Sequence, residues 1–179
     1  MSGAKRILVV VDMQNDFITG PLGTPEARAI VPRVEEKIRG FEGPVLFTKD
    51  THGADYLQTQ EGRLLPVPHC VRGTAGWELE PGIEALREQT AIEKGSFGFL
   101  GLADVLREYQ RRWGLERVEV VGLCTDICVI SNVMILKAAL PEVPVVVDAS
   151  CCAGVTPESH RRALEAMRAC QVLVEEPAR

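Results

Sequence analysis

The chain has 179 residues and a formal net charge of −5 at pH 7, with 46% hydrophobic and 25% charged residues. This length favours one domain spanning residues 1–179, and the acidic balance without a basic cluster argues against nucleic acid or an anionic membrane as partner. No apolar run reaches the roughly 18 residues of a membrane span, and no signal-type cleavage region follows the N-terminus, so we expect a cytoplasmic protein. The six cysteines are too scattered for a secreted disulfide scaffold.

Apolar runs with strand character alternate along the chain with segments of helical periodicity. In chain order we expect a strand at residues 6–14, a helix at 26–39, a strand at 44–50, a helix at 81–88, a strand at 90–94, a helix at 100–113, a strand at 118–122, a helix at 126–140, a strand at 144–150, a helix at 156–170 and a strand at 172–174. Residues 53–82 lack periodicity, and structureless stretches of that length are usually functional. The alternation predicts a parallel sheet with helices on both faces, a three-layer α/β/α fold.

Charged side chains end three of these strands. Asp12 ends the apolar run of the first strand, Asp50 ends the second and Lys94 ends the third. Because parallel strands bring their carboxyl ends to one edge of the sheet, these groups should meet where open α/β sheets bind ligands. One interpretation is a salt bridge between Asp12 and Lys94 that closes the sheet edge.

Cys128 offers a second interpretation, because it follows the fourth strand after a sharp turn and begins a helix. The helix dipole favours a thiolate there, and the free N–H groups of the first turn can hold an oxyanion. Together these residues predict a catalytic triad with Cys128 as nucleophile, Asp12 as base and Lys94 as the cation that holds Asp12. The alternatives are a buried cysteine packed as a small hydrophobic residue and a redox protein that pairs Cys124 with Cys128.

A candidate metal site lies near the second strand. Asp50 and His52 leave the end of that strand together, and His69 lies in the long segment that follows. One carboxylate and two imidazoles suit Zn²⁺, Fe²⁺ or Mn²⁺, and Glu61 is a further possible ligand. The alternative is a pair of histidines that hydrogen-bond within a loop. We expect the third histidine, His160, to be a solvated residue of a surface helix.

Five short motifs carry a family resemblance. They are VVVDMQNDF at 9–17, KDTH at 49–52, PHCVRGTAG at 68–76, EKGSFGF at 93–99 and GLCTDICV at 122–129. In these motifs, their order and their spread over nearly the whole chain, the protein resembles the isochorismatase-like cysteine hydrolases, and within them the nicotinamidases and pyrazinamidases. The resemblance implies an isochorismatase-like hydrolase fold with a six-stranded parallel sheet in the order 3-2-1-4-5-6, assembled as a homodimer or homotetramer.

The resemblance also implies roles for individual residues. The family's base aspartate, lysine and nucleophile fall on Asp12, Lys94 and Cys128, and its metal ligands fall on Asp50, His52 and His69. Its oxyanion hole uses the backbone N–H groups of Cys124 and Cys128, with a cis peptide between Leu123 and Cys124. Phe17 would form an aromatic wall beside the substrate ring.

The activity implied is a metal-containing amidohydrolase of NAD salvage that converts nicotinamide and water to nicotinate and ammonia through a thioester on Cys128. The cofactor implied is one divalent ion, Zn²⁺ with Fe²⁺ or Mn²⁺ as alternatives. The chain departs from nicotinamidases before the proline–histidine segment, where they commonly carry a tryptophan and this chain reads RLLPV at residues 63–67. The alternative functions are cleavage of a carbamoyl, ureido or other small amide, and ether hydrolysis of the isochorismatase type.

Overall fold

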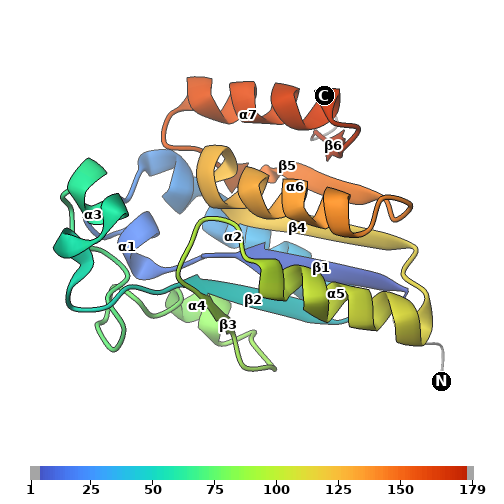
Figure 1. Ribbon diagram of the computed structural model, residues 1–179, viewed down its shortest axis with the longest axis horizontal. Coiled ribbons are helices and arrows are strands. Elements are labelled where there is room, and N and C mark those ends of the chain that lie inside the picture. The colour runs from blue at the N-terminus through green and yellow to red at the C-terminus, as the bar shows by residue number, and fades with distance from the viewer. Residues whose placement is uncertain (1–4, 177–179) are drawn as a thin grey trace.

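The computed structural model describes residues 5–176, and within that range a six-stranded sheet forms the centre of the molecule (Figure 1). All neighbouring strands are parallel, and their order is β3-β2-β1-β4-β5-β6. The strands are β1 (Arg6–Val11), β2 (Val45–Asp50), β3 (Ile92–Lys94), β4 (Arg117–Leu123), β5 (Val145–Ala153) and β6 (Leu173–Glu175). The three-layer fold and the strand order predicted above are confirmed.

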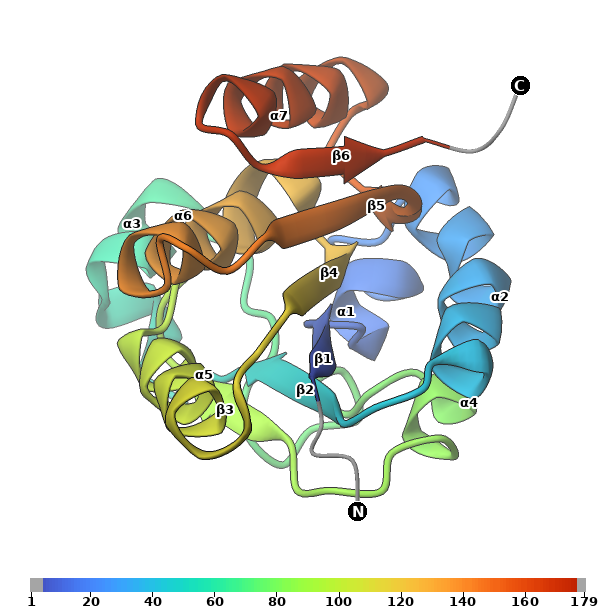
Figure 2. The same cartoon turned by 90° about the vertical axis from the view of Figure 1, so that its right-hand side faces the viewer.

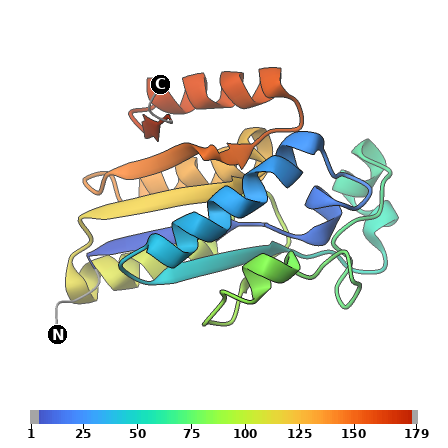
Figure 3. The same cartoon turned by 180° about the vertical axis from the view of Figure 1, so that it is seen from behind.

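Helices cover both faces of this sheet, as Figure 2 shows from its edge. The longer helices are α2 (Pro25–Gly40), α5 (Leu100–Trp113), α6 (Ile130–Ala139) and α7 (Pro157–Ala169), and the short ones are α1 (Asn15–Ile18), α3 (Gln60–Leu64) and α4 (Pro81–Glu84). Helices α2 and α4 lie on one face (Figure 3), whereas α5, α6 and α7 pack on the other. None of the helices within residues 5–176 is long and apolar enough to cross a membrane.

The apolar runs of the sequence produce this layering because β1 is buried on both sides. Ile7, Val9 and Val11 pack into the core under α5, α6 and α7, whereas Leu8 and Val10 pack under α2. A strand covered on both faces needs a continuous apolar run rather than an alternating one. The side chains that are free to carry chemistry are therefore those at the carboxyl end of the sheet, where α1 and α3 lie (Figure 1).

A charged residue is buried within β4, away from the carboxyl end of the sheet. Glu119 in the middle of β4 is 1% exposed, and its carboxylate is paired with Lys37 at 2.8 Å, with Arg117 at 2.9 Å and with Arg6. These cations hold the pKa of Glu119 below its ordinary value of 4.5 against the opposing effect of burial. Since a buried acid is tolerated only with such partners, this network keeps a charge within an otherwise apolar strand.

The carboxyl end of β4 has an unusual backbone, of which the family resemblance had implied the cis peptide but not the other features. Gly122 has φ +116°, and a Cβ there would overlap the carbonyl oxygen of Val11 on β1. The following Leu123–Cys124 peptide is cis, as expected. Cys128 does not begin a regular α-helix, because a π-helical turn, η2 (Thr125–Val129), precedes α6.

The segment predicted to be structureless is ordered. Residues 53–82 contain the 3₁₀ turn η1 (Tyr56–Gln58) as well as α3 and the start of α4. Tyr56 is 1% exposed, and its hydroxyl donates to the Leu65 carbonyl at 2.9 Å. One buried tyrosine thus organises turns that are too short to show periodicity in the sequence.

Candidate active site

Asp12 stands directly after β1, in a left-handed backbone conformation with φ +47°, which aspartate adopts more readily than most residues. The residue is 0% exposed, and Thr48 on β2 donates a hydrogen bond of 2.6 Å to Asp12 Oδ1. Burial raises the pKa of the Asp12 carboxyl, while Lys94 opposes that rise. The neighbouring strand therefore fixes one oxygen and leaves Oδ2 to face the lysine.

Lys94 ends β3 and brings together three of the predicted residues. Its Nζ is 2.7 Å from Asp12 Oδ2, 3.3 Å from Asp50 Oδ1 and 3.4 Å from Cys128 Sγ. Asp12 Oδ2 receives no well-aligned hydrogen bond, so its contact with the lysine is an ion pair and the oxygen keeps a lone pair for a proton. The carboxylates of Asp12 and Asp50 raise the Lys94 pKa despite its burial, so the lysine stays cationic.

Cys128 is 3% exposed. Burial is the largest influence on its thiol and raises its pKa well above 9.0, with Asp12 adding to the rise and Lys94 opposing it. Desolvation thus opposes the thiolate that a helix start favours. Asp12 is an acidic group near this thiol, and both groups lie close to the Lys94 ammonium.

Four ligand-type side chains meet beside the triad. Asp50, His52, Glu61 and His69 place one donor atom each within 4.8 Å of the others. His52 Nε2 is 3.0 Å from Asp50 Oδ2 and 3.5 Å from Glu61 Oε1, while His69 Nε2 is 3.7 Å from each of the same two oxygens. Glu61, the lower-ranked candidate ligand, thus lies in the cluster with the other three.

The donor set fits a divalent metal ion. Two imidazole nitrogens and two carboxylate oxygens are the ligand types of Zn²⁺, Fe²⁺ and Mn²⁺ sites. His69 Nδ1 lies 2.8 Å from the Val67 carbonyl, and donation to that oxygen leaves Nε2 unprotonated and facing the cluster. Two buried histidines directed at two carboxylates form a site for a metal rather than a loop hydrogen-bond pair.

A cavity of about 220 Å³ is lined by Cys128 and by three of the four ligand-type residues, whereas Asp12 and Lys94 are buried behind it. Phe17 is in its wall, with its ring centroid 5.5 Å from that of His69, and Cys124 and Cys128 line it with Asp50. Sequence reasoning missed most of the apolar wall, because loop residues carry no periodicity that shows where they point. The residues lining the cavity are Phe17, Leu22, Asp50, Glu61, Leu65, His69, Phe97, Cys124, Ile127, Cys128 and Val155.

Trp77 and His160 do not line the cavity. Trp77 is outside the cavity wall and donates from its indole to Thr51 at 2.9 Å, under the ammonium of Lys49. His160 was expected to be solvated, but it is half-buried and its Nδ1 lies 2.8 Å from Thr125 Oγ1. Its helical pattern did not reveal this contact because the partner belongs to the irregular turn before α6.

Known proteins share both the sequence pattern and the fold. The isochorismatase domain matches residues 6–176. A nicotinamidase/pyrazinamidase of Mycobacterium tuberculosis is 32% identical over 183 residues, which cover 93% of this chain and 96% of that protein. A pyrazinamidase of Pyrococcus horikoshii solved in complex with zinc superposes with a TM-score of 0.78 at 29% identity, covering 97% of this chain and 99% of that one.

The nicotinamidase/pyrazinamidase of Bacillus subtilis superposes with a TM-score of 0.81 at 30% identity, covering 96% of this chain and all of that one. The residues matched by the family, 6–176, include the six strands, the cavity lining and the four ligand-type residues. The chain therefore belongs to the isochorismatase domain family, as its five motifs predicted.

Proposed function

We propose that this protein is a metal-containing cysteine amidohydrolase that converts nicotinamide and water to nicotinate and ammonia. One observation carries the proposal: the Cys128 thiol and the metal-ligand cluster line the same small cavity, whose other walls are largely apolar. A flat heteroaromatic amide suits such a cavity, since its ring can pack against Phe17 while its carboxamide faces the thiol. The similarity to several nicotinamidases supports the choice of substrate.

The chain's own residues can perform the proton transfers. Asp12 takes the thiol proton as Cys128 Sγ attacks the amide carbon, and the backbone N–H groups of Cys124 and Cys128 are the proposed donors to the oxyanion. Asp12 then passes the proton to the amide nitrogen, the C–N bond breaks and ammonia leaves. In the second half, Asp12 deprotonates the water that cleaves the thioester, which releases the acid and restores the thiol. Lys94 remains cationic and balances the charge on Asp12 throughout.

Asp50, His52, Glu61 and His69 are the residues that would hold the metal. When bound, a divalent ion supplies a Lewis-acidic anchor for the ring nitrogen of the substrate. We propose Zn²⁺, because the donor set suits it and a similar pyrazinamidase was solved with zinc.

The six free cysteines support a cytoplasmic location. We also propose a role in NAD salvage, one domain over residues 1–179 and a homodimer or homotetramer. Residues 1–4 and 177–179 lie outside the described part of the chain.

An ammonia-release assay on zinc-loaded protein tests the function. We expect the wild type to hydrolyse nicotinamide and Cys128→Ala to be inactive. Cys170→Ala should match the wild type, because Cys170 is exposed and lies at the C-terminal end of α7. Mass spectrometry of quenched reactions should detect an acyl adduct on Cys128. No ammonia from nicotinamide, but turnover of carbamoyl or ureido amides or of a vinyl ether, would replace the substrate, and activity retained by Cys128→Ala would refute the mechanism.

A further inference from the structure

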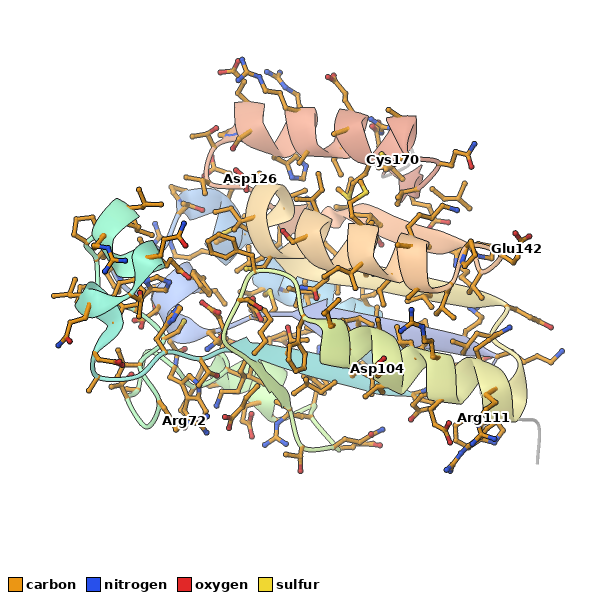
Figure 4. All side chains as sticks on the ribbon, viewed as in Figure 1. Arg72, Asp104, Arg111, Asp126, Glu142 and Cys170 are labelled. Carbon is orange, nitrogen blue, oxygen red and sulfur yellow. The ribbon has the colours of Figure 1, made fainter. Side chains whose placement is uncertain are left out.

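The turn that carries the nucleophile is fastened to the start of α7 by two side chains. Thr125 Oγ1 lies 2.8 Å from His160 Nδ1. Asp126 accepts a hydrogen bond from the backbone N–H of Val155, with N–O distances of 3.1 and 3.4 Å to its two carboxylate oxygens. Figure 4 shows Asp126 at this junction, between the turn before α6 and the loop that leads into α7.

The hydrogen bond between Thr125 and His160 is buried at its Thr125 end. Thr125 is 0% exposed, so its hydroxyl needs a protein partner, and an unsatisfied group there costs about 1–3 kcal/mol. Burial lowers the pKa of His160, against the opposing field of Asp126. With the ring proton on Nε2, the imidazole accepts at Nδ1 from the threonine hydroxyl, and with the proton on Nδ1 it donates to that oxygen.

The packing around His160 fixes its position relative to the turn that carries Cys128. Gly154 lies against the backbone of the first turn of α7, where an added Cβ would come within 2.9 Å of His160 N. Thr156 and Ser159 cap the same helix reciprocally, which fixes the start of α7. Val155, between the glycine and the cap, lines the active-site cavity. The start of α7 is therefore a rigid support that reaches the cavity wall.

Thr125 lies between the two residues whose N–H groups are the proposed oxyanion donors, Cys124 and Cys128. We propose that His160 is a positioning residue, which holds the π-turn through Thr125 so that the Cys128 sulfur and these N–H groups keep their mutual geometry. This inference rests on the proposed function for its catalytic consequence. The contact itself does not depend on the substrate, and neither residue belongs to the metal-ligand cluster on the other elements of the site.

The test compares His160→Ala, His160→Asn and Thr125→Val with the control Arg161→Ala, which alters an exposed neighbour in α7. Displacement of catalytic groups by about 1 Å costs up to roughly a hundredfold in rate, so we expect His160→Ala and Thr125→Val to lower kcat about 10- to 100-fold. Their KM and zinc content should stay near wild type, because the ligand cluster is untouched. His160→Asn should recover most of kcat, since its amide oxygen can accept from Thr125. The double variant His160→Ala/Thr125→Val should be no worse than either single one.

A second readout separates this inference from the function. The rate at which iodoacetamide alkylates Cys128, measured by peptide mass spectrometry, should fall in His160→Ala and return in His160→Asn even if nicotinamide proves not to be the substrate. The inference is overturned if His160→Ala keeps wild-type kcat and alkylation rate, if the asparagine variant is as impaired as the alanine variant, or if the loss follows the unfolded fraction measured by circular dichroism. Inactive wild-type protein with unchanged alkylation behaviour across the series overturns both proposals.

Discussion

Replacing Lys94 by methionine should damage both stability and activity, because the side chain neutralises two acids in the interior. Lys94 is 1% exposed, and Asp12 and Asp50 are equally buried, with their oxygens 2.7 and 3.3 Å from its ammonium. Removing one member of a buried ion pair costs about 3–5 kcal/mol. The free energy of unfolding of a native protein is typically about 5–15 kcal/mol. The variant should therefore lose a large part of its stability and nearly all of its activity.

Urea unfolding of metal-free protein at pH 5 and pH 8 measures this loss. Burial raises the folded-state pKa of Asp12 above 3.8, and Lys94 opposes that rise, so without the lysine Asp12 takes up a proton at a higher pH. Because the folded state then binds more protons than the unfolded state, acidification favours folding, and the loss should be smaller at pH 5 than at pH 8. Adding Asp12→Asn should recover part of the stability but no activity.

Lys137→Met is the matched control, since that lysine reaches only the Pro141 carbonyl, at 3.5 Å, and should cost less than about 0.5 kcal/mol. The electrostatic explanation is refuted if Lys94→Met costs less than about 1 kcal/mol, if its cost is equal at the two pH values, or if the double variant is no more stable than the single one.

Three further substitutions test other parts of the structure. Gly122→Ala should lower the free energy of unfolding by more than about 2 kcal/mol, because Gly122 has φ +116° and an added Cβ would overlap the backbone of Val11. Urea unfolding measures this loss, and it should show no such loss for Gly40→Ala, where the space around the residue is open. Glu119→Gln should cost about 2 kcal/mol at pH 7. Since the folded pKa of Glu119 lies below 4.5, its contribution is present above 4.5 and disappears as pH falls through the folded value, so unfolding titrations should show less acid destabilisation in the variant. Glu61→Gln should weaken zinc binding at least about tenfold, measured by competition with a chromophoric chelator.

Each of these expectations has an outcome that contradicts it. Equal stabilities of Gly122→Ala and the wild type would mean that the two strands can separate without cost. If Glu119→Gln loses as much stability in acid as the wild type does, that loss comes from other carboxylates. Zinc affinity equal to that of the exposed control Glu165→Gln would remove Glu61 from the ligand set.

Residues at strand ends were predictable because parallel strands have one common carboxyl edge. Asp12, Asp50 and Lys94 follow buried runs, so topology alone brings them together once the sheet is recognised. The proposed nucleophile needed one more step, since Cys128 is separated from its strand by a turn. There the family motif supplied what periodicity lacked, and it also carried the cis peptide that no propensity rule anticipates.

The remainder of the site depends on contacts that have no local signature. Phe97 and Val155 lie on loops, where side-chain direction is set by the packing of distant segments rather than by a repeat. The proposed ligand Glu61 lies on α3, which is too short to be recognised by its pattern. His160 was misjudged for a related reason, because its partner Thr125 is buried by tertiary structure alone.

Asp50 belongs to both halves of the active site, with one oxygen toward Lys94 and the other toward the histidines. A substitution there is therefore a poor genetic tool for asking what the metal does, because the loss of activity would combine an emptied ligand position with a lysine deprived of a counterion. His69 lies in the cluster but carries no negative charge that balances Lys94, so its variants separate the two effects. Directed evolution of the metal preference should also be easier at His69 or Glu61 than at Asp50, because every change of Asp50 alters both the metal site and the counterion of Lys94.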